Sequence, residues 1–196
     1  MWQKAEEKLL KDKYIKPLIK KWGHCTIKPI KKQKYFEDLV DAICSQQLSG
    51  KAAQTIFTRV KNLLVKITPD NILSTKDQKL RDCGLSWQKV SYVKDLATKV
   101  VGGDLDILIL DEFSDEEVIT KLVAVKGIGR WTAEMFLMFS LARPDIFPKD
   151  DLGIQKAIDA IVKNETSKVD KLKFSEKWKP YRTVASWYLW RSLENG

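Results

Sequence analysis

Apolar residues recur at steps of three and four positions along most of the chain, which is the spacing of amphipathic helices. The segment from Trp87 to Val101 is a clear case. Its apolar positions fall on one helical face: Val90, Val93, Leu96, Ala97 and Val100. No stretch of the sequence shows the sustained alternation of apolar and polar residues that marks a half-buried strand. The pattern predicts about nine or ten helices and therefore an all-α fold.

Turn and capping residues divide this pattern into separate helices. Thr68-Pro69 and the Ser114–Glu117 capping box each predict a helix start. The first periodic segment covers residues 2–22, and Pro17 predicts a kink or break just before it. A lysine-rich loop is expected over residues 163–173. Because no Pro- or Gly-rich linker divides the chain, we expect all 196 residues to form one domain, built as two helical lobes with a cleft between them.

The sequence Gly127-Ile128-Gly129 predicts a tight turn between two helices, the second running from Trp131 to Leu141. Glycine adopts positive φ without steric cost, so two glycines around one aliphatic residue suit such a turn. The backbone amides that open the second helix lack helical partners, and such amides bind anions. Gly127, Gly129 and Arg130 are therefore candidate phosphate-binding residues.

Two other polar stretches, one before and one after this hairpin in the sequence, are candidate site segments. Cys44 to Gly50 joins two amphipathic helices and contains Gln47 and Leu48, which suits a loop that reaches an external surface. An ordinary polar turn between helices is the alternative. The pair Asp150-Asp151 precedes a later helix, so Asp151 is either a helix N-cap, a reactive carboxylate or both. A phosphate site followed by a carboxylate suggests chemistry on a nucleic acid.

Composition narrows the class of protein. Hydrophobic residues make up 44% of the 196 residues and charged residues 31%, which is typical of a folded protein. Lys and Arg number 35 against 26 acidic residues, a net charge of +9 that favours polyanionic partners, although a solvated lysine-rich surface explains it equally well. The charged N-terminus lacks the pattern of a signal peptide, and no apolar run is long enough to span a bilayer. The three cysteines are widely spaced, so we expect buried, reduced thiols.

Five sequence blocks carry a family resemblance. They are FEDLVDAICSQQLSGKAA (36–53), CGLSWQKVSYVKDLA (83–97), LVAVKGIGRWTAEMFLMF (122–139), FPKDDLGIQKA (147–157) and WKPYRTVASWYLWR (178–191). In their order and content these blocks resemble the helix-hairpin-helix (HhH-GPD) DNA glycosylases, and most of all the DNA-3-methyladenine glycosylase II type. The resemblance implies a bilobal, all-α glycosylase fold with a helix-hairpin-helix at about 114–142. The chain resembles the compact form of these enzymes, which lacks an N-terminal β-containing domain.

The resemblance also implies roles for single residues. Asp151 matches the essential aspartate, with Asp150 as the second choice. Gln47 and Leu48 match the residues that intercalate into the gap left by an extruded nucleotide. The base pocket would be lined by Trp131, Met135 and Trp190, with Met135 standing where a relative carries an aromatic residue. The residue pattern by itself would assign Trp190 to core packing.

Departures from the wider superfamily matter as much. Bifunctional glycosylase/lyases carry a lysine one residue after the hairpin turn, where this chain has Trp131, and Lys126 lies on the wrong side of the turn. Iron–sulfur members end in four closely spaced cysteines, and this chain has no cysteine after Cys83. The resemblance thus implies no lyase activity and no iron–sulfur cluster. It also implies a Na⁺ or K⁺ ion held by hairpin carbonyl groups, with Val123, Val125 and Ile128 as candidates.

The function implied is base excision repair by a monofunctional DNA glycosylase. Such an enzyme flips an alkylated purine, of the 3-methyladenine or 7-methylguanine type, out of double-stranded DNA and hydrolyses its N-glycosidic bond. A monomer is expected, cytoplasmic and nucleoid-associated in a prokaryote and nuclear in a eukaryote. Two alternatives remain open: a non-catalytic helix-hairpin-helix DNA-binding protein, and a glycosylase for another lesion, which the change at Met135 allows.

Overall fold

The computed structural model describes residues 1–162 and 170–194, and within these residues all regular secondary structure is helical. The all-α prediction is confirmed for this part of the chain. The chain forms two compact units: residues 30–136 make one, and residues 1–29 together with the described residues from 137 onward make the other. Residues 163–169 of the predicted lysine-rich loop lie outside the described residues. The prediction is wrong for its last three residues, because a helix capped by Asp170 begins at Lys171.

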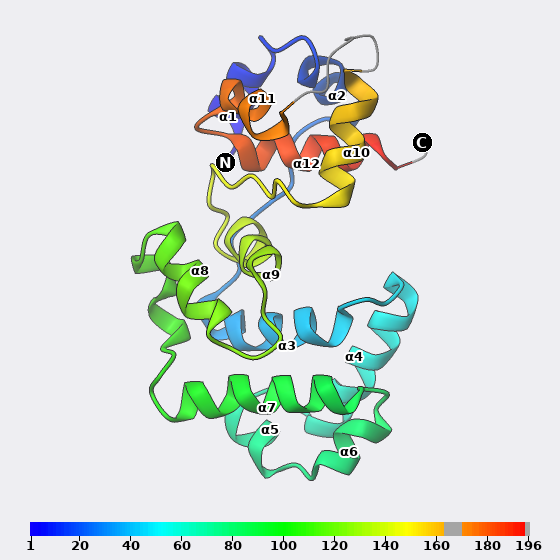
Figure 1. Cartoon of the computed structure of the whole chain (residues 1–196), viewed down its shortest axis with the longest axis vertical. Coiled ribbons are helices and arrows are strands. Elements are labelled where there is room, and N and C mark those ends of the chain that lie inside the picture. Colours follow the sequence, from blue (N-terminus) through cyan, green and yellow to red (C-terminus); the bar gives the residue numbers. More distant parts are fainter. Residues whose placement is uncertain (163–169, 195–196) are drawn as a thin grey trace. The chain divides into compact units, whose positions relative to one another are not determined.

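The unit of residues 30–136 is built around the long helix α7 (Trp87–Val101), which packs against α3, α5 and α6 (Figure 1). The α-helices of this unit are α3 (Tyr35–Ser45), α4 (Gly50–Leu64), α5 (Pro69–Ser74), α6 (Asp77–Asp82), α7, α8 (Asp115–Val123) and α9 (Arg130–Met135), with 3₁₀ helices at Lys32–Lys34 and Ile107–Glu112. Leu39 and Ile43 of α3 and Val93 and Leu96 of α7 are fully buried. This packing places the end of α3 and the start of α7 beside the α8–α9 hairpin.

The other unit joins the two ends of the described chain in one core. Its helices are α1 (Gln3–Leu9), α2 (Ile15–Trp22), α10 (Leu152–Ile161), α11 (Lys171–Ser175) and α12 (Arg182–Ser192), with a 3₁₀ helix at Glu176–Trp178. Helix α12 packs against α1, α2 and α10 (Figure 1). Trp178 and Tyr188 are completely buried in this core. The core therefore holds α10 and α12 together, and these two helices carry Asp151 and Trp190.

Predicted helix starts agree with the structure. Thr68 accepts a hydrogen bond from the Asn71 amide, and Pro69 is the first residue of α5. Ser114 and Glu117 form the reciprocal bonds of a capping box at the start of α8. Helix α7 spans Trp87–Val101, which are the predicted bounds.

The predicted break just before Pro17 is wrong. Helix α1 ends at Leu9, α2 begins at Ile15, and Pro17 is the third residue of α2. Proline is tolerated there because amides in the first helical turn have no intrahelical acceptor. The Asp12 carboxylate accepts hydrogen bonds from the Tyr14 and Ile15 amides, so Asp12 rather than Pro17 determines where the second helix starts.

The helix predicted after the hairpin turn changes character halfway. Helix α9 ends at Met135, and residues Phe136–Ser140 continue as a π-helical turn. Periodicity cannot distinguish the two forms over so few residues, because the apolar positions Phe136, Leu137 and Met138 are all buried. No helix among the described residues combines the length and the apolar character that crossing a bilayer requires.

Candidate nucleic-acid interface and active site

The two glycines of the hairpin turn have different roles. Gly127 has φ +80°, and a Cβ atom added there would lie 2.0 Å from Cδ2 of the Tyr92 ring, so only glycine fits. Gly129 has φ −91° and ψ 172°, and nothing lies within 4 Å of an added Cβ atom. The prediction that both glycines serve positive φ is therefore wrong for Gly129, which is instead the N-cap of α9.

The start of α9 keeps the features of an anion site, but Arg130 does not extend it. Gly129 provides no side chain to cap the first amides of α9. The guanidinium of Arg130 lies 2.6 Å from Oε1 of Glu116 and 3.2 Å from Oε1 of Glu134. The hydrogen bond from Arg130 lowers the pKa of Glu116, so both groups are charged at neutral pH. Arg130 is thus already paired with carboxylates of its own chain.

A hollow of about 450 Å³ lies beside the hairpin turn. Its lining residues come from the loop after α3, the start of α7, the turn and α9: Gln46, Gln47, Ser86, Gln88, Lys89, Tyr92, Gly127, Gly129, Trp131 and Thr132. The structure thus brings together four predicted site residues, namely Gln47, the two glycines and Trp131. Leu48 is not among the lining residues and is 39% exposed.

The segment between α3 and α4, residues 46–49, is an exposed loop as predicted, and we call it the 46–49 loop. Its first residue, Gln46, donates a hydrogen bond from Nε2 to the carbonyl oxygen of Gly127 at 2.8 Å. Gln47 follows with φ 56°, in the left-handed region that non-glycine residues seldom adopt. The 46–49 loop is therefore bonded to the hairpin turn, a connection that the sequence did not predict.

Asp151 is held at the start of α10 by two hydrogen bonds. Its Oδ1 atom accepts from the Ile154 amide at 2.8 Å and from Nε1 of Trp190 at 2.9 Å. The carboxylate is half-buried, whereas the side chain of Asp150 is 71% exposed and pairs with Lys149. Asp151 is thus an N-cap, as one prediction had it, and it is also oriented by a tryptophan.

The absence of a side chain at Gly153 allows the Trp190 indole to approach Asp151. A Cβ atom added at Gly153 would lie 3.0 Å from Oδ1 of Asp151 and 3.1 Å from Nε1 of Trp190, both tighter than ordinary contacts. Trp190 also packs against Phe139, with ring centroids 5.9 Å apart and planes at 35°. Sequence reasoning missed Gly153 and Phe139, and the only signal for Gly153 was a glycine inside a helical pattern.

The predicted site residues divide between the two units. Asp151 and Trp190 belong to the unit of residues 1–29 and 137 onward, together with Phe139. Trp131 and Met135 belong to the unit of residues 30–136, as do Gln47 and Leu48. Trp131 is 47% exposed, and Met135, the last residue of α9, is half-buried.

Comparison with known proteins identifies the family. The profile of the HhH-GPD superfamily of base excision DNA repair proteins matches residues 40–180 of this chain. This chain belongs to the HhH-GPD superfamily. The matched range contains the 46–49 loop, the hairpin and Asp151, and it ends before Trp190.

The similarity of this HhH-GPD protein to its relatives extends over most of the chain. DNA-3-methyladenine glycosylase 1 of Schizosaccharomyces pombe is 38% identical over 169 residues, which are 83% of this chain and 74% of that protein. The solved structure of an S. pombe 3-methyladenine DNA glycosylase in complex with abasic DNA has a TM-score of 0.83 at 37% identity and covers 97% of this chain and 96% of that one. A DNA-3-methyladenine glycosidase from Bacillus halodurans has a TM-score of 0.84 at 34% identity, covering 96% and 88%.

The three cysteines of this HhH-GPD protein are buried, as the sequence predicted. All three thiols are free and buried. Burial raises the pKa of Cys25 to about 11 and that of Cys44 to about 12, so these thiols stay protonated at neutral pH. Among the described residues, no group of three or more His, Cys, Asp or Glu side chains is arranged to hold a metal ion.

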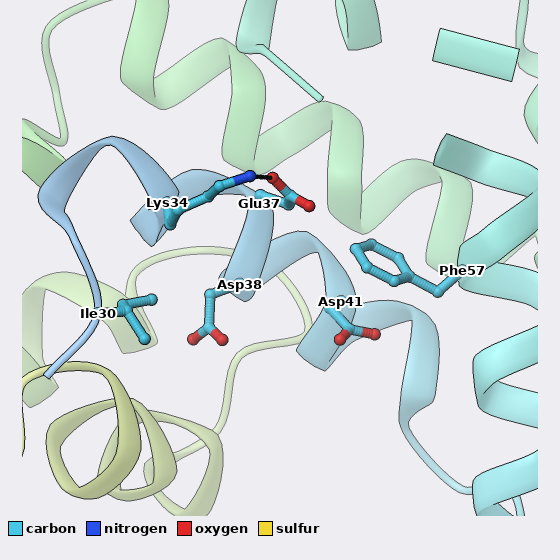
Figure 2. A pocket seen from close by; sticks show the side chains of 6 residues that line it. All are labelled: Ile30, Lys34, Glu37, Asp38, Asp41 and Phe57. Carbon is cyan, nitrogen blue, oxygen red and sulfur yellow. Dashed lines mark hydrogen bonds and ion pairs between the residues drawn. The ribbon is translucent and has the colours of Figure 1, made fainter. Parts of the chain in front are cut away.

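A second hollow, of about 250 Å³, lies against α3 and has a different chemical character (Figure 2). Ile30 and Phe57 supply its apolar lining, and the remaining side chains are Lys34, Glu37, Asp38 and Asp41. Glu37 pairs with Lys34 and Lys61, and Asp41 accepts a hydrogen bond from Ser45. Three carboxylates repel a phosphate backbone, so this hollow is unsuited to binding DNA.

Proposed function

We propose that this protein is a monofunctional DNA glycosylase that releases alkylated purines from double-stranded DNA. Family membership places it among base excision DNA repair proteins. Relatives of 34–38% identity named for 3-methyladenine support an alkylated base as the substrate. The observation that carries the proposal is the carboxylate of Asp151, half-buried and oriented by the Ile154 amide and the Trp190 indole.

The chemistry requires little more than this carboxylate. As the bond between C1′ and the base nitrogen breaks, its electron pair leaves with the base and positive charge develops on the sugar. An oriented carboxylate stabilises that charge and can accept a proton from the water molecule whose oxygen bonds to C1′. Alkylation at a ring nitrogen makes the base cationic, so it departs as a neutral molecule without a general acid. One aspartate is therefore sufficient for this class of substrate.

Tryptophan side chains suit a cationic base. The electron-rich face of an indole attracts a cation by about 0.5–2 kcal/mol. Trp131 is 47% exposed on α9, and the half-buried ring of Trp190 packs beside Phe139. This preference adds to the weaker glycosidic bond of the alkylated nucleotide, and the two together favour damaged over normal bases.

DNA binding is assigned to the hairpin turn and to Gln47 and Leu48 of the 46–49 loop. Uncapped amides after Gly129 bind the phosphates, and lysine side chains around them add an electrostatic contribution that decreases with salt. Arg130 contributes less than the sequence suggested, because Glu116 and Glu134 already occupy its guanidinium. Gln47 and Leu48 fill the gap in the stack, which offsets the cost of a few kcal/mol for extruding a nucleotide.

A lyase step is excluded from the proposal by the residues near the turn. Trp131 occupies the place where lyases of this superfamily carry a lysine. The Lys126 amine lies 3.8 Å from Oδ1 of Asp95, and its backbone amide donates to Oδ2 of the same residue. Lys126 is therefore paired with a carboxylate of its own chain, and we assign it no nucleophilic role.

The hairpin carbonyl groups are suitable donors for a monovalent cation. Val123 is the last residue of α8, and the final carbonyl groups of a helix lack intrahelical donors. The Val125 carbonyl accepts one hydrogen bond, from the Ile128 amide, and retains a second lone pair. We propose the carbonyls of Val123, Val125 and Ile128 as Na⁺ or K⁺ ligands that would rigidify the turn.

The test is the release of a free base from duplex DNA carrying one defined lesion. Asp151→Asn keeps the shape of the side chain, removes its charge, and is expected to reduce the rate of base release by at least about a thousandfold while DNA binding persists. Asp150→Asn is the matched control and is expected to retain the wild-type rate. Borohydride added during the wild-type reaction should trap no covalent protein–DNA adduct.

Each arm has a result that would contradict the proposal. Base release by Asp151→Asn at the wild-type rate would show that this carboxylate has no part in the reaction. Trapping of an adduct would show amine chemistry, and thus a lyase. Duplexes carrying 3-methyladenine, 7-methylguanine, hypoxanthine or 8-oxoguanine identify the lesion class.

A further inference from the structure

The 46–49 loop is held in place by two side chains that have no assigned role, Lys89 and Gln46. The Nζ atom of Lys89, on α7, donates to the carbonyl oxygens of Cys44 and Gln46, each at 2.7 Å. The side chain of Gln46 then donates to the carbonyl oxygen of Gly127 at 2.8 Å. A continuous run of hydrogen bonds thus connects α7, the end of α3, the loop and the hairpin turn, all within the unit of residues 30–136.

Lys89 is not placed like a lysine that binds DNA by charge. It is half-buried, and burial lowers its pKa below the usual value. Two of its three N–H donors are directed at backbone carbonyls. These carbonyls belong to the last turn of α3 and to the residue after it, where a cation also interacts favourably with the helix dipole.

The loop needs such support because its own backbone is unfavourable. Gln47 has φ 56°, a conformation that costs energy for any residue with a Cβ atom. The next residue, Leu48, is 39% exposed and is not one of the buried core residues that could hold the loop. Gln46, which precedes this pair, is bonded through its backbone to Lys89 and through its side chain to the hairpin turn.

We propose that Lys89 and Gln46 are positioning residues that fix the 46–49 loop relative to the hairpin turn, so that Gln47 and Leu48 enter the stack at the nucleotide whose phosphates the hairpin binds. The proposal rests on the DNA-binding part of the proposed function. Neither side chain needs to touch DNA for this role. Their loss weakens the binding of a gapped stack and leaves the general attraction to duplex DNA unchanged.

The experiment compares two duplexes of the same sequence, one intact and one with a single tetrahydrofuran residue as an abasic analogue. Lys89→Met retains the aliphatic stem and removes both hydrogen bonds. Its affinity for the abasic duplex is expected to fall about tenfold, with affinity for the intact duplex unchanged. The slope of log Kd against log salt concentration is expected to stay at the wild-type value, because Lys89 neutralises no phosphate.

Lys94 supplies a matched control on the same helix. Its Nζ atom donates to the carbonyl oxygens of Leu73 and Thr75 at 3.1 Å and 2.6 Å and lies 3.2 Å from Oδ1 of Asp77. Lys94→Met therefore removes the same kind of paired hydrogen bonds, here from the α5–α6 connection, together with one ion pair. That variant is expected to keep the wild-type preference for the abasic duplex. A loss of preference in Lys94→Met equal to that in Lys89→Met would show a general effect of destabilising α7 and would overturn the proposal.

Gln46→Met is the second variant, and it decides the question if Lys89→Met does not fold. It is expected to lose preference for the abasic duplex in the same selective way. In the double variant the losses are expected to be less than additive, because both side chains hold one loop. The proposal is overturned if Gln46→Met keeps the full preference, or if Lys89→Met lowers the salt slope by about one, the mark of a direct phosphate contact.

These binding measurements require no base release, so the positioning role and the proposed catalysis are tested independently. If the wild-type protein releases no alkylated base but Lys89→Met loses the abasic preference selectively, the assigned catalysis is wrong and the positioning role stands. If base release depends on Asp151 but both positioning variants bind like the wild type, the positioning role is wrong.

Discussion

Asp150 and Asp151 are neighbours in the sequence, but their side chains have very different surroundings. Asp150 is exposed and pairs with Lys149, whereas Asp151 accepts hydrogen bonds from a helix amide and an indole. The helix N-cap could be predicted, because an acid directly before an apolar-periodic segment is a local signal. The bond from Trp190 could not, because it joins residues 39 positions apart and depends on how α12 packs against α10.

Gly153 gives a direct test of whether Trp190 orients the aspartate. In Gly153→Ala the new Cβ atom would press on the Trp190 indole at 3.1 Å, so the indole must move and its bond to Asp151 must lengthen. We expect the single-turnover rate of base release to fall by about tenfold. Alanine is the better helix former within α10, which opposes the cost of this tight contact, and the free energy of unfolding of Gly153→Ala measures the balance.

Trp190→Phe serves as the reference background for that prediction. It removes the indole N–H, and Gly153→Ala added to it is expected to cost little more, because the affected bond is already absent. A wild-type rate in Gly153→Ala, or full additivity of the two substitutions, would show that the indole does not act through Asp151.

At the scale of elements, helix bounds were predictable where caps mark them, and the geometry of the connections was not. Helix α7 has the predicted bounds, and α3 ends and α4 begins within two residues of the connection predicted at Cys44 to Gly50, because caps and apolar periodicity are local properties. The division of labour between Gly127 and Gly129 was not predictable. It depends on Tyr92 of α7, which lies under Gly127 and leaves no space for a side chain.

The two hairpin glycines are therefore expected to respond differently to alanine. Gly127→Ala places a Cβ atom inside the Tyr92 ring and forces a positive φ on alanine, and we expect it to cost at least about 2 kcal/mol of unfolding free energy and most of the DNA affinity. Gly129→Ala meets no neighbour and has an extended backbone, so its cost should stay below about 1 kcal/mol. Urea unfolding measures both. Equal destabilisation by the two substitutions would contradict this account of the turn.

At the scale of the whole molecule, the sequence suggested two helical lobes but not which residues form each. Residues 1–29 share a core with the C-terminal part of the chain, and residues 30–136 form the other unit. Periodicity shows which face of a helix is buried and not which partner covers it. Tyr188 of α12 illustrates the missing information, since its hydroxyl lies 3.0 Å from Oε1 of Glu6, 182 positions earlier in the chain.

Glu6 makes the stability of that shared core depend on pH. The carboxylate is 5% exposed, and burial raises its pKa, but hydrogen bonds from His24, the Cys25 amide and Tyr188 together leave the pKa below the usual value of 4.5. The unfolded chain therefore binds this proton more readily than the folded one. The stabilisation is complete above about pH 4.5 and is lost as the pH falls through the lower pKa of the folded state.

We accordingly expect the wild-type free energy of unfolding to fall as the pH is lowered below about 4.5, with Glu6 contributing part of the slope. Glu6→Gln should be less stable than the wild type at pH 7 and should show a flatter decrease in acid, since glutamine does not titrate. Glu37→Gln is the comparison: its carboxylate also has a lowered pKa, from hydrogen bonds with Lys34 and Lys61, but it lies in the other unit. Urea unfolding followed at several pH values measures these curves. If Glu6→Gln retained the full acid slope of the wild type, the Glu6 carboxylate would not contribute to the pH dependence of the free energy of unfolding.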